Sequence, residues 1–320
     1  MRNLADLPCP RIPLVFSRHY ATAPWGGRRI IERFNRKDAP PECSESWEIS
    51  ARPDFPGRVT GGPYEGAGLD ELASAYGAAF TGAKAPDPRK FPLLFKLIDA
   101  RERLSVQVHP DDRTAQTAGG EAKSECWLVI DATADAALYA GLVPGTTREK
   151  LERASRDGDP SFLLERTPVR RGDALYIPGG TVHAIDAGCL VYEVQQSSDT
   201  TYRFYDWGRT GRDGKPRQLH IEEGLAVTAY DRPAPKPVRA ADGLETPYFS
   251  VRSLTLRGRT VFPGNASTFQ AFFTVSGEAE ISAGGTTAAA PAGQSVLVPA
   301  GADATVSPAA GGAEIIRTTL

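Results

Sequence analysis

The fold of this chain is best deduced from residues 104–112, which read Leu-Ser-Val-Gln-Val-His-Pro-Asp-Asp. An extended strand sends alternate side chains to opposite faces, so Gln107 and His109 point to one side and the aliphatic residues to the other. Pro110 and the two aspartates after it are typical of a strand end. A glutamine and a histidine on one face of a strand form half of a metal site. The alternative is a core histidine beside a hydrogen-bonded glutamine, and only further ligands elsewhere in the chain decide between the two.

The rest of the chain has the composition of a protein made of many short strands. Its 320 residues are 41% hydrophobic, which is enough for two domains with sizeable cores. The 32 glycines and 26 prolines separate short runs of β-branched residues. This pattern predicts a mainly β chain built as sandwiches or barrels.

Charge and hydrophobicity argue against several classes of partner and location. The formal net charge is −2 and no long basic block occurs, so no nucleic acid or membrane partner is expected. Three prolines interrupt the first 16 residues and no apolar run reaches 18 residues, so we expect a soluble cytoplasmic protein. The four cysteines are scattered at positions 9, 43, 126 and 189, and we expect free thiols in a reducing compartment.

Hydrophobic patterns predict several further elements. Strands are expected at 44–50, 91–100, 123–130 and 190–196, helices at 69–80 and 146–164, a polar segment at 197–212 and a linker at 231–242. Thr146 or Thr147 is expected to cap the second helix. Lys96 interrupts the apolar strand at 91–100, and a lysine buried there requires a specific partner.

Two more segments supply candidate metal ligands. In the strand that begins at Lys123, the two-residue period places Lys123 and Glu125 on one face. Residues 169–185 read as a strand, a Pro-Gly-Gly turn and a second strand, with His183 just after the turn. The combined set is Gln107, His109, Glu125 and His183. These ligand types suit zinc and tolerate manganese, iron or cobalt, and the lack of cysteine favours a site with room for substrate. His19 and His220 lie outside the pattern, so packing or surface roles are expected for them.

One stretch of the chain repeats. Residues 172–183 and 293–304 both begin with glycine and have a proline six residues after it. Each stretch ends five residues after that proline, and the two final residues can be compared. The compared residue is His183 in the first copy and Ala304 in the second. We interpret this as a duplicated barrel in which only the first copy keeps a metal. The expected domains are therefore residues 1–235, which bind metal and carry catalysis, and residues 236–320, a second metal-free domain.

Six segments, in order over about two thirds of the chain, resemble the type I phosphomannose isomerases in their shorter bacterial form. They are Pro-Trp-Gly-Gly at 24–27, Glu-Ser-Trp-Glu-Ile-Ser at 45–50, the stretch at 104–112, Lys-Ser-Glu-Cys-Trp at 123–127, Gly-Thr-Val-His-Ala-Ile at 180–185, and Glu-Val-Gln-Gln-Ser-Ser-Asp-Thr-Thr-Tyr-Arg-Phe-Tyr-Asp-Trp-Gly-Arg at 193–209. Six ordered matches are far more specific than one motif. The chain departs from the family at Ser124, where threonine or proline is usual, and at Gly179, where many members have alanine.

The resemblance implies two cupin-type jelly-roll barrels and one divalent metal, usually zinc. It implies interconversion of mannose 6-phosphate and fructose 6-phosphate, and it places Gln107, His109, Glu125 and His183 on the metal ligands. Arg203 falls on the arginine to which the family assigns a catalytic part. A guanidinium and a metal ion facing the charge of an enediolate would lower the barrier to its formation.

The reaction also needs a base that removes a proton from carbon. Glu193, a metal-bound water and His183 are all candidates, and the sequence does not choose among them. Lys123 is expected to point into the same pocket and to hold substrate oxygens or move a proton. The alternative for Lys123 is a surface lysine at a strand start.

The substrate phosphate is expected to contact Lys96, Ser105 and Arg209. Ser105 shares a face with Gln107, and an anion in the cavity would account for the buried charge of Lys96. A solvated arginine is the alternative for Arg209. Asp199 is expected to orient Arg203, by analogy with the family's Ser-Asp pair.

The expected partner is a phosphorylated hexose, and the expected assembly is a monomer or weak homo-oligomer. Three alternatives stay open. One is an iron-dependent dioxygenase, against which Lys96 and Arg209 argue. The others are a cupin that binds sugar without chemistry and an isomerase of a related phosphorylated sugar.

Overall fold

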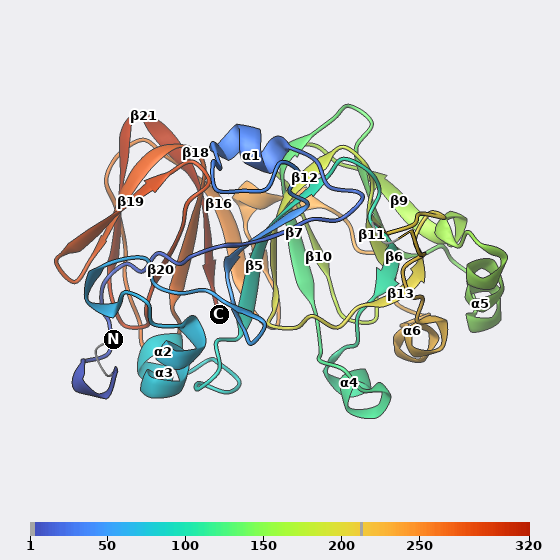
Figure 1. Ribbon diagram of the computed structural model, residues 1–320, viewed down its shortest axis with the longest axis horizontal. Coiled ribbons are helices and arrows are strands. Elements are labelled where there is room, and N and C mark those ends of the chain that lie inside the picture. The colour runs from blue at the N-terminus through green and yellow to red at the C-terminus, as the bar shows by residue number, and fades with distance from the viewer. Residues whose placement is uncertain (1–3, 212–213) are drawn as a thin grey trace. The chain divides into compact units, whose positions relative to one another are not determined.

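The computed structural model describes residues 4–211 and 214–320, and these form two compact units. The central unit comprises residues 20–46 and 96–238. The terminal unit comprises the described residues up to 19, residues 47–95 and residues 239–320. The chain passes between the units within four strands, which are β1 (His19–Ala21), β2 (Glu45–Ile49), β5 (Leu93–Ala100) and β14 (Val238–Arg239). Of these, β5 is labelled in Figure 1.

Antiparallel pairing builds two sheets around the central unit. One has the order β1-β2-β5-β12-β7-β10-β14 and the other the order β13-β6-β11-β8-β9. Their remaining strands are β6 (Val106–Val108), β7 (Glu125–Ala132), β8 (Ala137–Leu142), β9 (Leu164–Pro168), β10 (Asp173–Ile177), β11 (His183–Ile185), β12 (Cys189–Gln196) and β13 (Tyr202–Tyr205). The helices of this unit are α1 (Arg29–Phe34), α4 (Asp112–Ala118), α5 (Arg148–Asp157) and α6 (Ile221–Val227).

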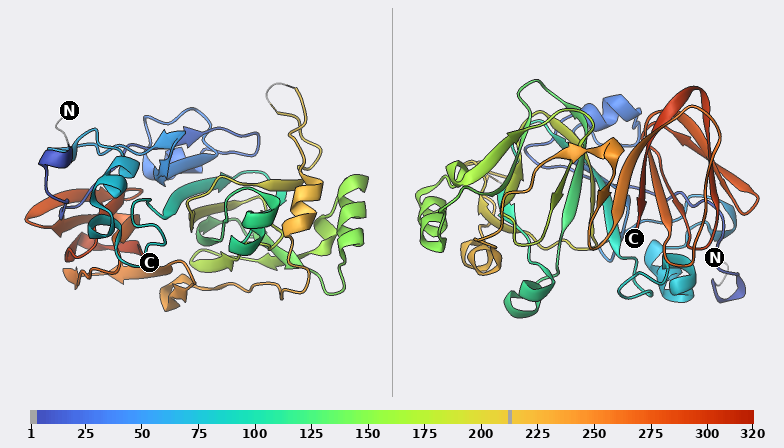
Figure 2. Two further views of the ribbon diagram at one scale, coloured as in Figure 1. Left: turned by 90° about the horizontal axis from the view of Figure 1, so that it is seen from below. Right: turned by 180° about the vertical axis from the view of Figure 1, so that it is seen from behind.

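Alternation along the strands gives the five-stranded sheet two different faces. Val106 and Val108 point outward and pack with Leu151 of α5 and Leu225 of α6, the two helices that lie beside each other in Figure 2. The core on the other side joins residues of both sheets, and Leu104 belongs to that core rather than to the outer face that we expected. The inner face of β6 is thereby left to its polar residues, because the aliphatic ones are used outside.

Three local predictions needed adjustment. Thr147 does cap α5, since its hydroxyl accepts a hydrogen bond from the backbone N–H of Lys150, but the helix ends at Asp157 rather than at residue 164. The helix expected at 69–80 is divided into α2 (Leu69–Tyr76) and α3 (Ala78–Thr81), because Gly77 between them has a φ of 52°. The polar segment at 197–212 contains strand β13, which the polar composition concealed.

The terminal unit is built on two long, bent strands. Its sheet has the order β15-β16-β21-β18-β19, with β17 paired to β21 and β20 paired to β18. The strands are β15 (Leu244–Glu245), β16 (Ser250–Leu256), β17 (Thr260–Phe262), β18 (Gln270–Ala283), β19 (Thr286–Pro291), β20 (Ser295–Val298) and β21 (Ala304–Thr319), with a separate pair β3 (Ala51–Arg52) and β4 (Phe55–Pro56). The expectation of a mainly β chain with a few short helices is confirmed.

The compact units differ from the expected division at residue 235. The C-terminal sheet recruits earlier parts of the chain: the backbone of Leu14 exchanges two hydrogen bonds of 2.8 and 2.9 Å with that of Leu297 in β20. Such pairing is invisible in the local sequence because the partners are far apart along the chain. The assignment of catalysis to residues 1–235 stays a prediction.

The predicted repeat has matching backbone conformations. Gly172 and Gly293 have φ values of 84° and 85°, and in the following turns Gly180 and Gly301 have values of 87° and 75°. The residues compared at the end of the repeat, 183 and 304, are the first residues of β11 and β21. The two copies therefore use glycine where the chain must adopt a left-handed conformation.

The four cysteines lie within the described residues, and all four are thiols outside any disulfide, as expected. Among the helices of the described residues, none combines the length and apolar character that a membrane crossing requires.

Candidate metal centre

Three predicted ligands meet inside the central unit. His109 follows β6, while Glu125 and His183 are the first residues of β7 and β11. Their candidate ligand atoms all lie within 4.8 Å of one another, and each residue is at most 1% exposed. Strand ends of both sheets thus place two imidazoles and a carboxylate around one point.

Strand register adds Gln107 to this group. Gln107 is paired with His183 across β11 and with Arg203 across β13, and directly paired residues of antiparallel strands point to the same face. Its side-chain nitrogen lies 3.3 Å from Nε2 of His183, and its oxygen accepts a 3.2 Å hydrogen bond from Ser105. The side-chain amide of Gln107 can rotate to present its oxygen instead of its nitrogen to a cation, since the two groups are of similar size.

Backbone carbonyls fix both histidine rings. Nδ1 of His109 lies 2.7 Å from the carbonyl oxygen of Thr200, and Nδ1 of His183 lies 2.8 Å from that of Thr181. Each Nδ1 must therefore carry the proton and donate it, which leaves a lone pair on Nε2 toward the cluster. This arrangement is typical of metal-ligating histidines.

Burial keeps these rings neutral. Desolvation, assisted by the positive charge of Lys123, lowers the pKa of His109 to about 3, and desolvation also lowers the pKa of His183. For Glu125, burial alone would raise the pKa, but the charge of Lys123 and the nearby His109 hold it well below its usual range. The cluster consequently offers an ionised carboxylate and two neutral imidazoles.

Several atoms of the cluster lack hydrogen-bond partners although they are buried. These atoms are Nε2 of His109 and both carboxylate oxygens of Glu125. Nζ of Lys123 lies 3.2 Å from one of these oxygens, an ion pair that does not meet hydrogen-bond geometry. Unpaired lone pairs are costly in a protein interior, and a shared cation would satisfy them together. The residues therefore fit a divalent metal ion.

A second group of charged side chains lies on the seven-stranded sheet, next to the cluster. Glu193 accepts a 2.9 Å hydrogen bond from the indole N–H of Trp127, with which it is paired across β12 and β7. Desolvation and the negative charge of Glu125 raise the pKa of Glu193 to about 7. Lys96 lies 3.8 Å from Glu193 and 3.4 Å from Glu45. Burial would lower the pKa of Lys96, but these two carboxylates raise it to about 12.

The positive charge of Lys96 is thus already paired with carboxylates of the protein. One of them, Glu45, was not among the candidate site residues predicted from the sequence. A signal was available, because Glu45 shares with Trp47 the alternating segment at 44–50. Its pairing with Lys96 depends on two strands that are far apart in sequence.

Arg203, the expected catalytic arginine, is partly buried in β13. One guanidinium nitrogen donates a 2.9 Å hydrogen bond to the carbonyl oxygen of Gln218, and its Nε is buried with no hydrogen-bond partner. Its backbone N–H lies 3.4 Å from Nδ1 of His220, so this histidine packs behind the arginine. His19 stacks on Phe55 with ring centroids 3.5 Å apart, a packing role of the kind expected.

Two of the predicted substrate-binding residues make their contacts with residues other than the metal ligands. Asp199 is exposed, and its backbone N–H donates a 3.4 Å hydrogen bond to a carboxylate oxygen of Glu121. Within the described residues, Asp199 forms no hydrogen bond or ion pair with Arg203. Arg209 forms a 2.6 Å ion pair with Asp206 and donates to the carbonyl oxygen of Arg103. Their proposed roles stay predictions.

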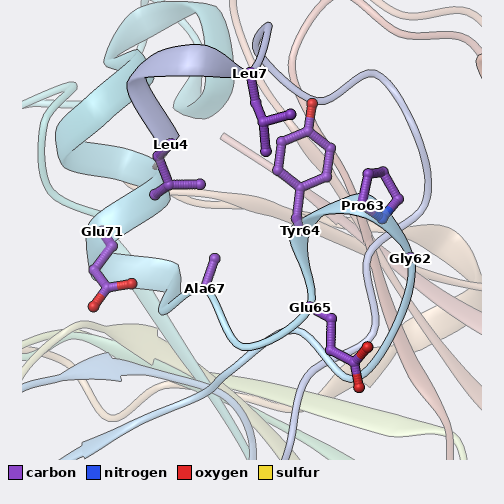
Figure 3. A pocket seen from close by; sticks show the side chains of 8 residues that line it. All are labelled: Leu4, Leu7, Gly62, Pro63, Tyr64, Glu65, Ala67 and Glu71. Atoms are coloured by element: carbon purple, nitrogen blue, oxygen red, sulfur yellow. The ribbon is translucent and has the colours of Figure 1, made fainter. Parts of the chain in front are cut away.

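The terminal unit contains a different kind of pocket. It has a volume of about 330 Å³ and is lined by Leu4, Leu7, Gly62, Pro63, Tyr64, Glu65, Ala67 and Glu71 (Figure 3). Its wall combines apolar side chains with a tyrosine and two carboxylates, and it lacks the imidazole ligands of the central unit. It therefore offers no comparable chemistry.

Comparison with known proteins gives consistent matches. The type I phosphomannose isomerase catalytic domain matches residues 15–137. The mannose-6-phosphate isomerase of Streptococcus mutans is 41% identical over 244 residues, which cover 73% of this chain and 76% of that protein. The probable mannose-6-phosphate isomerase GmuF of Bacillus subtilis is 37% identical over 262 residues, covering 78% and 82%.

Solved structures agree with the sequence matches. The mannose 6-phosphate isomerase of Bacillus subtilis is similar with a TM-score of 0.85 at 30% identity, over 96% of this chain and 99% of that one. A zinc-bound mannose 6-phosphate isomerase has the same fold, with a TM-score of 0.73 at 17% identity over 96% and 98% of the chains. The fold common to these proteins is the cupin fold.

Proposed function

This chain belongs to the type I phosphomannose isomerase family, and from that premise we propose how its own residues carry out the reaction. It is an aldose–ketose isomerase that interconverts mannose 6-phosphate and fructose 6-phosphate. The observation that best supports the residue assignment is the buried cluster of His109, Glu125 and His183, with both imidazoles held so that Nε2 faces inward.

Zinc is the cofactor, and Gln107, His109, Glu125 and His183 would hold it. When bound, the metal ion supplies positive charge that stabilises the oxyanions of an enediolate. The residues of this chain prepare that site by staying deprotonated, because burial keeps the histidines neutral and Lys123 keeps Glu125 ionised. Lys123 is proposed to hold a substrate oxygen beside Glu125, where its charge already lies.

Arg203 is proposed to stabilise the charge that develops on the substrate. It is paired with Gln107, so its side chain starts on the same face as a proposed ligand. Glu193 is the proposed base. A raised pKa of about 7 suits proton transfer at neutral pH, since the group is then partly deprotonated and able to bind the proton it receives.

The phosphate is proposed to be bound by Lys96, Ser105 and Arg209. Support is strongest for Ser105, which is buried and bonded to Gln107. Lys96 already has Glu45 and Glu193 as partners, so its proposed contribution is to position those carboxylates as well as to attract an anion. Asp199 is proposed to orient Arg203, and its charge also contributes, after those of Glu45 and Glu193, to raising the pKa of Lys96.

The assay that tests the function is direct. Purified protein should convert mannose 6-phosphate to fructose 6-phosphate, chelation should abolish turnover, and added zinc should restore it. Full turnover by protein shown to be metal-free would overturn the proposed roles of the four ligands. No conversion by the zinc-loaded protein, with conversion of another sugar phosphate, would instead favour an isomerase of a related sugar.

The remaining assignments concern the protein as a whole. We propose a cytoplasmic enzyme that is a monomer or weak homo-oligomer, with catalysis in residues 1–235 and a metal-free cupin domain in residues 236–320. Ala304 in place of a histidine supports the second domain's lack of a metal. Light scattering and metal analysis of the intact protein would test the assembly and the ratio of one metal per chain.

A further inference from the structure

Gln195 is a buried residue beside the metal ligands to which no role has been given. It lies on β12 directly opposite Glu125 of β7, and paired residues of antiparallel strands point to the same face. Glu193, two residues earlier on β12, shares this face and is held there by Trp127. Gln195 therefore occupies the wall of the same site, and its side chain is 0% exposed.

Hydrogen bonds determine which way the amide of Gln195 is turned. Its nitrogen donates to the backbone carbonyl oxygens of Gln196 and Ser198, at 2.8 and 2.7 Å. The reversed orientation would bring the amide oxygen against two carbonyl oxygens and would lose both bonds. The side-chain oxygen must therefore point away from these carbonyls, and the amide is rigidly held before any ligand binds.

That oxygen is unsatisfied. Oε1 of Gln195 is buried without a hydrogen-bond partner, as are Nε2 of His109, both oxygens of Glu125 and one oxygen of Glu193. A buried amide oxygen without a donor is destabilising, so a fixed one in a functional site indicates a donor that arrives with the ligand. Unlike the carboxylates, this oxygen is neutral, and its preferred partner is a hydroxyl rather than an ammonium group.

We propose that Gln195 is a substrate-positioning residue whose side-chain oxygen accepts a hydrogen bond from a hydroxyl of the sugar phosphate. The proposal rests on the isomerase function above and adds a specificity contact to it. Carbons 1 and 2 of the substrate react and carbon 6 carries the phosphate. In the pyranose form, in which oxygen 5 closes the ring, the hydroxyls at carbons 3 and 4 are left for recognition, and one of them is the partner of Gln195.

The test couples a change in the protein to a change in the substrate. Wild-type and Gln195→Met proteins, both zinc-loaded, would be assayed with mannose 6-phosphate and its 3-deoxy and 4-deoxy analogues. The wild type should lose roughly tenfold in kcat/KM with one of the two analogues, the effect of removing one neutral hydrogen bond. The variant should be weakened with mannose 6-phosphate itself and should discriminate against that analogue by less than threefold.

Binding and metal content provide readouts that do not depend on turnover. The unreactive 1-deoxymannose 6-phosphate should bind the variant roughly tenfold more weakly by calorimetry, while zinc per chain stays unchanged. Loss of zinc from the variant would mean that Gln195 is a metal ligand and would overturn the proposal. Equal discrimination by wild type and variant would overturn it as well.

Two further variants keep the test decisive. Gln196→Met removes the neighbouring amide, whose oxygen accepts a 2.8 Å hydrogen bond from the backbone of Ser124, and it should leave the discrimination between substrates intact. Gln195→Leu replaces the methionine variant if that one does not fold. A wild type that converts mannose 6-phosphate but treats both deoxy analogues like the parent sugar refutes the positioning role alone. A wild type that does not convert mannose 6-phosphate refutes the function on which it rests.

Discussion

Replacing Arg203 by alanine is expected to remove most of the turnover without removing the metal. The guanidinium is desolvated, and the charges of Arg217 and Arg209 oppose its own, so its pKa is lowered to about 10. It is nevertheless protonated at neutral pH. One nitrogen is held by the carbonyl oxygen of Gln218 at 2.9 Å, while its buried Nε has no partner. A fixed donor with unused capacity is suited to charge that appears only during the reaction.

The size of the effect follows from this placement. Removing one preorganised donor from a developing oxyanion costs about 100- to 1,000-fold in kcat, or about 2.7–4 kcal/mol. We expect Arg203→Ala to fall in that range. Arg203→Lys keeps the charge but not the planar fork held by Gln218, so its kcat should lie between those of the alanine variant and the wild type.

The assay is kcat at saturating mannose 6-phosphate, with zinc per chain measured on the same samples. Arg156→Ala is the matched control, because that arginine is 52% exposed and pairs with Glu152 on the surface of α5. The control should stay within twofold of the wild type, as expected for a surface ion pair. An Arg203→Ala variant with full zinc and turnover within tenfold of the wild type would refute the reasoning, and Arg203 would then be a structural residue.

Three further substitutions test the stability and the electrostatics of the central unit. Arg29→Ala should lower the free energy of unfolding in urea by roughly 3 kcal/mol, because it strips the buried carboxylate of Asp99 of a 2.8 Å ion pair. Gly179→Ala should cost about 1–3 kcal/mol in the same experiment and weaken zinc binding, because its Cβ would lie 2.6 Å from the carbonyl oxygen of the residue after His109. Trp127→Phe should move the acidic limb of kcat/KM to higher pH, because the indole N–H bonded to Glu193 lowers the pKa of that carboxyl.

Each of these predictions has its own control. Arg28→Ala removes an exposed pair with Glu32 and should change the free energy of unfolding by less than about 0.5 kcal/mol, so equal effects at 28 and 29 would contradict the role of the buried pair. Gly258, which has open space around it and no left-handed φ, is the control for the alanine substitution at 179, and its replacement by alanine should change the free energy of unfolding by less than about 0.5 kcal/mol. If the acidic limb stays fixed in the Trp127→Phe variant while zinc is retained, Glu193 is not the base.

The cluster of candidate metal ligands was predictable because its members depend on local rules. Gln107 and His109 share a face through the alternation of a single strand, and Glu125 and His183 mark the starts of strands bounded by recognisable turns. The ordered family motifs added what periodicity lacks, namely that these separate segments serve one site. The replacement of the histidine by Ala304 was equally predictable, because both copies of the repeat keep their glycines. In the structure these glycines have matching φ values.

Other features depended on residues brought together from distant parts of the chain. The carboxylate partners of Lys96 and the carbonyl oxygen of Thr200 that orients His109 come from segments far apart in the sequence, and packing between strands and loops brings them together. For the same reason the sequence did not reveal that the charge of Asp199 contributes, after those of Glu45 and Glu193, to raising the pKa of Lys96.

The sequence by itself therefore determined which side chains share a strand face, because that alternation is a property of the covalent backbone. Only the tertiary structure decided their neighbours, protonation and orientation. Those properties depend on desolvation and on hydrogen bonds between residues that come close only after the sheets have paired.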